Sequence, residues 1–189
     1  LMVNVVGTIN ILEGMKKAGC KKIIFTSSGG TLCGDITNQP AKEDHKKEPM
    51  SPYALNKILS EEYIKFYNRI HGVDFVILRY TRVYGPRQYV GGSQGVPTIF
   101  IDNVIRGVQP KIYGDGSQMR DFVYISDAVE ANVLALSWKN ETVNIATQTE
   151  YTILDVLNII KKILGSDIEP EFLQPRQVDL REFCWIYHI

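Results

Sequence analysis

Residues 25–30 read FTSSGG and residues 51–57 read SPYALNK, and the rest of the chain is organised around these two stretches. In the first, an apolar run gives way to hydroxyls and glycines. The second opens with Ser-Pro, which favours the start of a helix because a hydroxyl cap precedes a residue whose φ is already helical. Tyr53 and Lys57 then lie about one helical turn apart and share a face.

This Tyr/Lys pair has the chemistry needed to take a proton from an alcohol. An ammonium beside a phenol favours the phenolate, and a nearby serine hydroxyl can orient a substrate alcohol. Tyr53 and Lys57 therefore indicate proton removal from a carbinol while hydride passes to a cofactor. The alternative is an ordinary exposed Tyr/Lys pair.

The composition favours a globular protein and excludes several classes of partner. Of the 189 residues, 44% are hydrophobic and 22% charged, and Lys+Arg 21 balances Asp+Glu 21. The chain has no excess of positive charge, so binding to nucleic acid is not expected. Cys20, Cys33 and Cys184 are odd in number and scattered, which favours reduced thiols in the cytoplasm and gives no support for a zinc site. No apolar run approaches the roughly twenty residues of a spanning helix, so a membrane location is not expected.

Hydrophobic spacing predicts a helix, a strand, a long helix and a second strand in the first half of the chain. These elements are expected over residues 3–18, 22–26, 51–71 and 75–78. The buried stripe of the long helix is expected to be Leu55, Leu59, Tyr63, Phe66 and Tyr67. This alternation is typical of a parallel α/β sheet.

Shorter, mixed elements follow. Helices are expected over residues 97–105, 127–138 and 152–164, and strands over 111–113, 122–125 and 142–145. Thr152 and Asp155 form a capping box for the last helix. This change of character predicts a small lobe packed on the edge of the sheet domain, a common place for a ligand cleft.

Five motifs lie in the order found in one family. They are residues 4–8 (NVVGT), 25–34, 51–57, 78–88 (LRYTRVYGPRQ), and 112–116 with 120–124 (IYGDG and RDFVY). Together they resemble the extended short-chain dehydrogenase/reductases, and in particular the NAD-dependent nucleotide-sugar epimerases and dehydratases of the UDP-glucose 4-epimerase type.

The resemblance implies an α/β fold, with a partial Rossmann-like parallel sheet, flanking helices and a small mixed α/β substrate-binding lobe. Residues 1–90 would form the sheet domain that carries the catalytic residues. Residues 91–189 would form largely the lobe, with some elements returning to the sheet domain.

The resemblance also implies roles for individual residues. Tyr53 would be the acid/base at the sugar hydroxyl, Lys57 would hold the nicotinamide ribose of NAD, and Thr81 would contact the nicotinamide. Ser28 would hydrogen-bond the sugar hydroxyl. Because the loop is one residue longer than in many relatives, Ser27 or Thr31 could take that place instead. The alternative for these hydroxyls is local hydrogen bonding at strand ends.

Several positions resemble the site for a UDP-sugar. Arg120 would clamp the diphosphate, for which a planar guanidinium is well shaped, although Arg120-Asp121 could also be a surface ion pair. The segment that would cradle the uracil, Lys111, Ile112 and Tyr113, could equally be a core strand. Arg176 and Asp179 resemble an Arg-x-Gly-Asp segment that contacts diphosphate and ribose, with valine in place of its glycine.

Two departures from the family limit what the resemblance implies. Arg82 stands where relatives carry an asparagine that meets the diphosphate. It could meet a phosphate or block the pocket. No glycine-rich turn between a strand and a helix is found near the N-terminus, where relatives bind the dinucleotide pyrophosphate. The chain begins at Leu1 rather than at a methionine, which suggests an incomplete protein with an unpaired, association-prone sheet edge.

The expected reaction is epimerisation at carbon-four of a UDP-sugar. Dehydratases of this family place an acidic residue where Gly29 and Gly30 stand, so a dehydratase or a reductase is a second alternative. The first alternative is a truncated or degenerate relative without catalysis, which binds a nucleotide sugar or is completed by another chain. A homodimer is expected, with the helices over residues 5–15 and 55–67 as its candidate interface; the alternative is that these apolar faces belong to the ordinary core.

Overall fold

The computed structural model describes residues 1–34, 40–91, 95–175 and 185–186. At its centre is a parallel sheet in the order β1-β3-β7, made of β1 (Lys22–Ser28), β3 (Asp74–Tyr80) and β7 (Glu141–Ile145). In the register, Ser28 lies opposite Tyr80, and Tyr80 opposite Ile145. The three strands therefore end at one edge, where α/β sheets usually bind their ligands.

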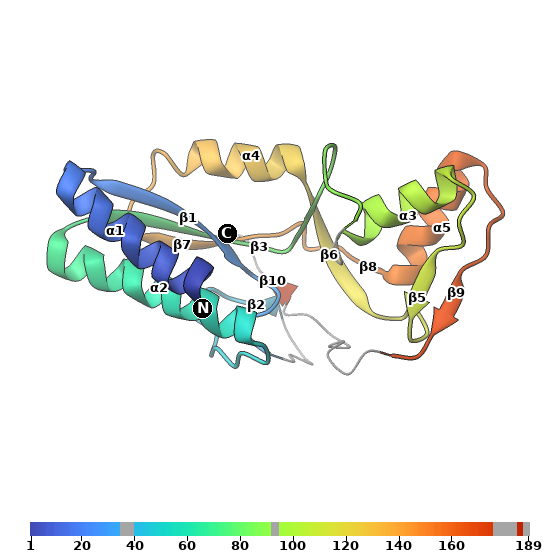
Figure 1. The fold of residues 1–189 in the computed structure, drawn as a ribbon, viewed down its shortest axis with the longest axis horizontal. Helices are drawn as coiled ribbons and strands as arrows, with labels where there is room; N and C mark the ends of the chain where they lie inside the picture. The colour runs from blue at the N-terminus through green and yellow to red at the C-terminus, as the bar shows by residue number, and fades with distance from the viewer. Residues whose placement is uncertain (35–39, 92–94, 176–184, 187–189) are drawn as a thin grey trace.

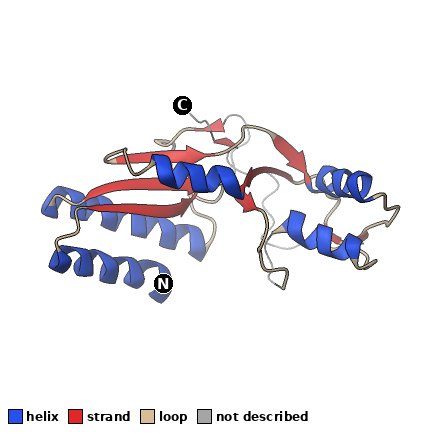
Figure 2. Ribbon diagram, turned by 90° about the horizontal axis from the view of Figure 1, so that it is seen from above, coloured by secondary structure: helices blue, strands red, loops and turns tan. Residues whose placement is uncertain are grey.

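Helices cover both faces of this sheet (Figures 1 and 2). On one face lie α2 (Pro52–His71) and α1 (Gly7–Ala18), which continues from a short π-helical turn at Met2–Val6. On the other lies α4 (Ile125–Leu134). The predicted Rossmann-like parallel sheet with flanking helices is confirmed. None of the described helices has both the length and the apolar character needed to span a membrane.

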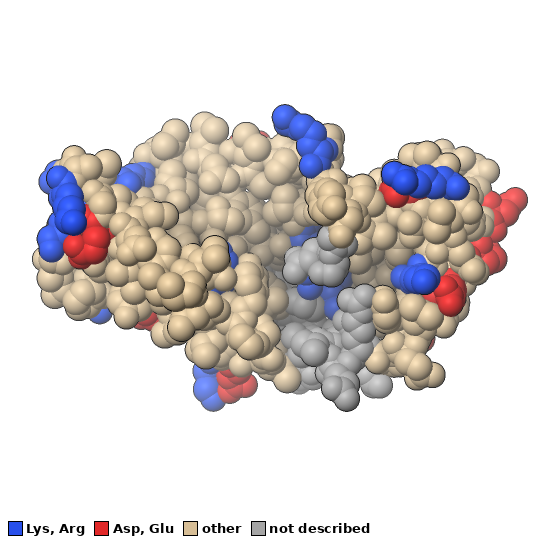
Figure 3. All heavy atoms as spheres, in the orientation of Figure 1, with Lys and Arg blue, Asp and Glu red and all other residues tan. Residues whose placement is uncertain are grey.

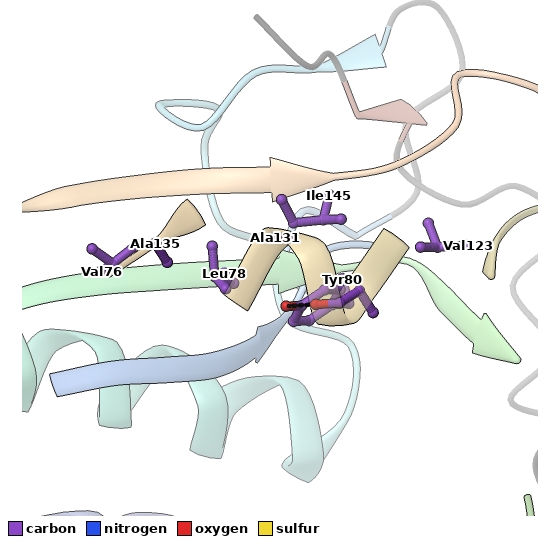
Figure 4. Close-up of a cluster of buried hydrophobic side chains, with 8 residues drawn as sticks. Val76, Leu78, Tyr80, Val123, Ala131, Ala135 and Ile145 are labelled. Atoms are coloured by element: carbon purple, nitrogen blue, oxygen red, sulfur yellow. Dashed lines mark hydrogen bonds between the residues drawn. The ribbon is translucent and has the colours of Figure 1, made fainter. Parts of the chain in front are cut away.

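Alternate residues of β3 serve the two faces, because successive side chains of a strand point in opposite directions. Val76, Leu78 and Tyr80 face α4, and the Tyr80 hydroxyl donates to the Ala128 carbonyl at 3.2 Å (Figure 4). The intervening residues of β3 pack with α1 and α2, in the cluster of Leu12, Ile64, Tyr67, Phe75 and Ile77.

A second group of elements lies beyond the carboxyl edge of the sheet (Figure 1). Its helices, α3 (Val96–Ile105) and α5 (Ile153–Leu164), pack on one another with Phe100, Ile112, Leu157 and their neighbours. The short strands β5 (Lys111–Tyr113) and β9 (Glu171–Leu173) pair in parallel beside them.

Three further strands connect this group to the sheet. They are β4 (Arg82–Tyr84), β6 (Met119–Tyr124) and β8 (Glu150–Thr152), with β6 in the middle. A two-residue pair, β2 (Pro40–Ala41) and β10 (Trp185–Ile186), completes the described strands.

The predicted buried stripe of α2 is wrong for four of its five residues. Leu55, Leu59, Tyr63 and Phe66 are exposed, and only Tyr67 is buried. The helix instead turns Ala54, Ser60, Glu61, Ile64 and Tyr67 inward. Both buried polar groups have hydrogen-bond partners: Ser60 donates to the carbonyls of Asn4 and Asn56, and Glu61 accepts from residues of β1 and β3. An apolar stripe is left facing solvent.

Candidate active site

The N-terminus of α2 holds Tyr53 at the protein surface. The Ser51 side chain accepts a hydrogen bond from the Ala54 N–H at 3.1 Å, and Pro52 occupies the first helical turn. This is the cap that the Ser-Pro sequence predicts. Tyr53 follows directly and is 47% exposed, so its phenol lies in the first turn of the helix and is open to solvent.

Lys57 joins this helix to the end of β1. Its ammonium donates to the Thr26 carbonyl at 2.8 Å and lies 4.9 Å from the centre of the Phe25 ring. The centre of the Tyr53 ring is 5.9 Å from the same nitrogen. Burial lowers the pKa of Lys57, and the nearby Glu61 carboxylate opposes that shift. The structure thus brings Tyr53, Lys57 and the carboxyl end of β1 together.

The hydroxyls at the end of β1 have different partners. Ser27 is 4% exposed and donates to Glu61 at 2.6 Å, beneath α2. Ser28 and Thr31 share a hydrogen bond of 2.9 Å. Because Ser27 is engaged in the interior, Ser28 and Thr31 remain as candidates for contact with a substrate.

Thr81 lies immediately after β3, at the same edge of the sheet. Its N–H donates to the Ile145 carbonyl at 3.2 Å, and its hydroxyl donates to Asp121 at 3.1 Å. Asp121 also accepts from the backbone N–H groups of Thr147 and Gln148, at 2.9 and 2.8 Å. This carboxylate therefore ties β6 to the ends of β3 and β7.

Glu61 and Arg79 form a buried ion pair that the sequence reasoning missed. Glu61 is 0% exposed and Arg79 is 3% exposed, and two hydrogen bonds of 2.9 and 2.7 Å join them. Burial opposes ionisation of Glu61, but Arg79 and Ser27 outweigh it, so the pKa of Glu61 lies below its ordinary value. One signal was available, because Tyr53, Lys57 and Glu61 recur every four residues along one helix.

Arg82 and Arg120 lie on the neighbouring strands β4 and β6. Arg82 pairs with Phe122 in the register, and Arg120 lies two residues before Phe122. Since residues two apart share a face of a strand, both arginines lie on one face of this small sheet. Arg120 is buried and donates to the Met119 carbonyl at 2.7 Å.

The segment expected to cradle a uracil is β5. Ile112 is buried in the core between α3 and α5, so only its main chain could meet a ligand. Lys111 is exposed and lies 3.9 Å from Glu171. The Tyr113 carbonyl accepts from Gln118 at 2.6 Å, and the Gln118 side-chain oxygen is buried without a hydrogen-bond partner among the described residues. Arg176 and Asp179 lie outside the described residues.

Comparison with known proteins identifies relatives that match most of the chain. The pattern of the NAD dependent epimerase/dehydratase family matches residues 1–146. A protein of Methanocaldococcus jannaschii is 49% identical over 93% of this chain and 57% of its own length. The UDP-glucose 4-epimerase of Mycolicibacterium smegmatis is 38% identical over 95% of this chain and 58% of its own length.

Solved structures that resemble this chain come from the same kind of protein as these sequence relatives. The UDP-glucose 4-epimerase of Thermotoga maritima, crystallised with UDP-glucose, superimposes with a TM-score of 0.95 and 38% identity, over 99% of this chain and 61% of that one. The UDP-glucose 4-epimerase of Thermus thermophilus, in complex with NAD, gives a TM-score of 0.93 and 34% identity, over 98% and 61%. The chain thus spans about three-fifths of the length of the proteins it matches.

Proposed function

This chain belongs to the NAD dependent epimerase/dehydratase family, and from that premise we propose that it carries the proton-transfer and sugar-binding residues of an NAD-dependent UDP-sugar 4-epimerase of the UDP-glucose/UDP-galactose type. One observation carries the proposal. The Lys57 ammonium donates a hydrogen bond to the carbonyl of Thr26, which lies two residues before Ser28 on β1, and the exposed phenol of Tyr53 is close to the same ammonium.

The described residues fit the nicotinamide end of NAD. An ammonium has three donors, and the Thr26 carbonyl takes one of those of Lys57. Lys57 would hold the nicotinamide ribose, and Thr81, at the adjoining strand end, would contact the nicotinamide. When bound, NAD accepts a hydride from the sugar and returns it.

Proton transfer would fall to the residues of this chain. Tyr53 would take the proton from the 4-hydroxyl as the hydride leaves and return it when the hydride comes back. Ser28, with its partner Thr31, would hold that hydroxyl in place.

The lobe would hold the nucleotide. Arg82 and Arg120 put two positive charges on one face of the β4–β6 sheet, which suits a diphosphate. Lys111, Tyr113 and the main chain of Ile112 would border the uracil. Arg176 and Asp179 would add contacts to the diphosphate and ribose. On this assignment, residues 1–90 supply the chemistry, and residues 91–189 supply mainly substrate binding.

Epimerisation is favoured over dehydration because Gly29 and Gly30 follow Ser28. Elimination of water needs a further acid/base group, and glycine supplies none. A reductase is a weaker candidate on the same residues.

We further propose a cytoplasmic homodimer. The scattered cysteines favour a reducing compartment. The exposed apolar side chains of Leu55, Leu59, Tyr63 and Phe66 on α2, with Ile11 on α1, form a surface suited to a second copy. In Figure 3 the part of the visible face over α1 and α2 is mostly uncharged, with charged side chains at its left end and at its lower edge.

A non-catalytic role, in which the chain binds a nucleotide sugar without converting it, is the competing function. Nucleotide binding separates the two. The purified chain is denatured and its supernatant scanned for released NAD, and NAD and UDP-glucose are then titrated separately by calorimetry. Catalysis requires that both bind. UDP-glucose binding without NAD supports the non-catalytic alternative, and binding of neither nucleotide overturns both.

A further inference from the structure

A carboxylate lies behind the candidate active site, where no substrate reaches it. One oxygen of Glu61 accepts from Arg79 at 2.9 Å and from Ser27 at 2.6 Å. The other accepts from Arg79 at 2.7 Å and from Lys47 at 3.2 Å. With four donors around two oxygens, this buried charge is fully paired.

Stability alone does not explain a pair of this kind. Removing two charges from water costs several kcal/mol per ion, and well-packed apolar residues of similar volume are often as stable or more so. What such a pair does provide is fixed geometry, because both bonds of Arg79 to the carboxylate are directional. The geometry that it fixes here is the contact between β1, β3 and α2.

The contacts of Glu61 continue the arrangement of the proposed catalytic residues. Tyr53, Lys57 and Glu61 follow one another at intervals of one helical turn on α2. Lys57 bonds the carbonyl of Thr26, and Glu61 bonds the hydroxyl of the next residue, Ser27. Two consecutive residues of the strand are thus tied to two consecutive turns of the helix.

We propose that Glu61 is a positioning residue: it fixes the end of β1 against α2, so that Ser27 stays in the interior, Ser28 is placed for the substrate, and the Lys57 ammonium is held beside Tyr53. Glu61 acts through these groups and touches neither substrate nor cofactor. The inference rests on the function proposed above for Ser28, Tyr53 and Lys57.

The charges around Lys57 make this inference measurable. Along α2 it faces Glu61 and Tyr53, and from β1 it faces the Phe25 ring and the Thr26 carbonyl. Arg79 from β3 and Lys47 from the segment before α2 form ion pairs with Glu61, and Lys65 of α2 adds a third nearby positive charge. Burial lowers the pKa of Lys57 and Glu61 opposes that effect. Removing the Glu61 charge also takes from Arg79 its ion-pair partner, with Glu43 left as a nearby negative charge, so both changes disfavour the Lys57 ammonium.

The experiment titrates Lys57 in the full chain labelled with ¹³C-lysine, with its signal assigned by its loss in Lys57→Arg. The matched control is Glu62→Gln, which removes an exposed carboxylate that also meets Lys47, at 3.3 Å. The Lys57 midpoint is expected to move to lower pH in Glu61→Gln and to stay at the wild-type value in Glu62→Gln. An unchanged Lys57 midpoint in Glu61→Gln overturns the proposal. Because loss of the Glu61 charge by itself also moves this midpoint, positioning is tested separately with Ser27→Ala, which keeps that charge.

A second variant covers the case in which Glu61→Gln does not fold. Ser27→Ala removes a single hydrogen bond to Glu61 and leaves the ion pair in place. If the Ser27–Glu61 hydrogen bond helps to position Lys57, the Lys57 ammonium protons should exchange with water faster in Ser27→Ala than in wild type. An unchanged exchange rate overturns the proposal. Neither measurement needs NAD or UDP-sugar, so a failure to bind those ligands bears on the proposed function alone.

Discussion

At the scale of single residues, two neighbouring serines at the end of β1 have different partners and should respond differently to removal. Ser27 donates to the buried Glu61, so Ser27→Ala should lower the free energy of unfolding by about 1 kcal/mol, the usual contribution of one hydrogen bond. Ser28→Ala should leave unfolding nearly unchanged and slow turnover by roughly tenfold, if its hydroxyl bonds the reacting alcohol. Urea unfolding and an NAD-supplied assay measure the two effects. A loss of stability in Ser28→Ala as large as that in Ser27→Ala would contradict the assignment.

Glu61 should also make part of the stability depend on pH. Its pKa is lowered in the folded chain, so the unfolded chain binds the proton first as the pH falls. The contribution is therefore complete above the ordinary glutamate value of about 4.3, and it is lost as the pH drops from there through the lower folded value.

Urea unfolding at several pH values tests this sign. Between pH values near ~5 and ~3, wild type and Glu62→Gln should lose stability more steeply than Glu61→Gln, which lacks the titrating group. At neutral pH, Glu61→Gln should be less stable by up to ~3–5 kcal/mol, because Arg79 loses its buried partner. Parallel pH profiles for wild type and Glu61→Gln would show that Glu61 is not the group responsible.

The sequence predicts which residues could perform the chemistry but not the contacts behind them. Tyr53 and Lys57 share a helix, so their spacing alone predicts that they are neighbours. The choice between Ser27 and Ser28 depends on which hydroxyl faces α2, and that depends on Glu61. The pairing of Glu61 with Arg79 joins a helix to a strand 18 residues away, and no local pattern encodes it.

At the scale of single elements, one lysine closes the end of α4. The Lys22 ammonium, at the start of β1, donates to the carbonyls of Ala135, Leu136 and Trp138 at 2.7, 2.7 and 2.6 Å. A cation is favourable at the C-terminal end of a helix, where carbonyls lack partners within the helix.

Lys22→Met should therefore destabilise the chain by about 1–2 kcal/mol. Lys21→Met, at the preceding exposed position, is the matched control and should change stability by less than ~0.5 kcal/mol. Thermal or urea unfolding of both variants measures the difference. If the two variants are equally stable, Lys22 does not stabilise the end of α4.

Most long elements could be predicted, because periodicity and caps identify them. The predicted strands over residues 22–26 and 75–78 lie within β1 and β3, and the Thr152–Asp155 capping box opens α5 as expected. Of the described short strands, β5 was predicted, whereas β2, β4, β8, β9 and β10 were not, since two or three residues rarely show a clear alternation. The orientation of α2 was mistaken because hydrophobic periodicity cannot distinguish a face that packs on the sheet from a face that remains exposed.

At the scale of the whole molecule, the exposed stripe on α2 should control association. Leu59→Glu or Phe66→Glu places a charge in the proposed interface, where desolvation of an unpaired charge is unfavourable. Either variant should shift the chain from dimer to monomer in sedimentation equilibrium. Ile163→Glu, at an exposed apolar position on α5, is the matched control and should leave the oligomeric state unchanged. A wild-type chain that stays monomeric at high concentration would contradict the dimer.

The β1 edge of the central sheet is a second surface through which the chain could associate. Among the described residues, β1 pairs only with β3, so its other side forms an edge of the parallel sheet. Exposed strand edges favour association with other chains. Association that persists in Leu59→Glu would therefore indicate the β1 edge, and loss of association would indicate α2.

The central claim is that Tyr53 moves the proton in an NAD-dependent interconversion of UDP-glucose and UDP-galactose. The measurement that tests it most directly is the rate of this interconversion by the purified chain supplied with NAD. We compare wild type with Tyr53→Phe and with Tyr63→Phe, an exposed tyrosine on the same helix. We predict turnover by wild type and by Tyr63→Phe, with a loss of roughly 10²–10⁴-fold in Tyr53→Phe. Near-normal turnover by Tyr53→Phe, or none by wild type, would contradict the claim.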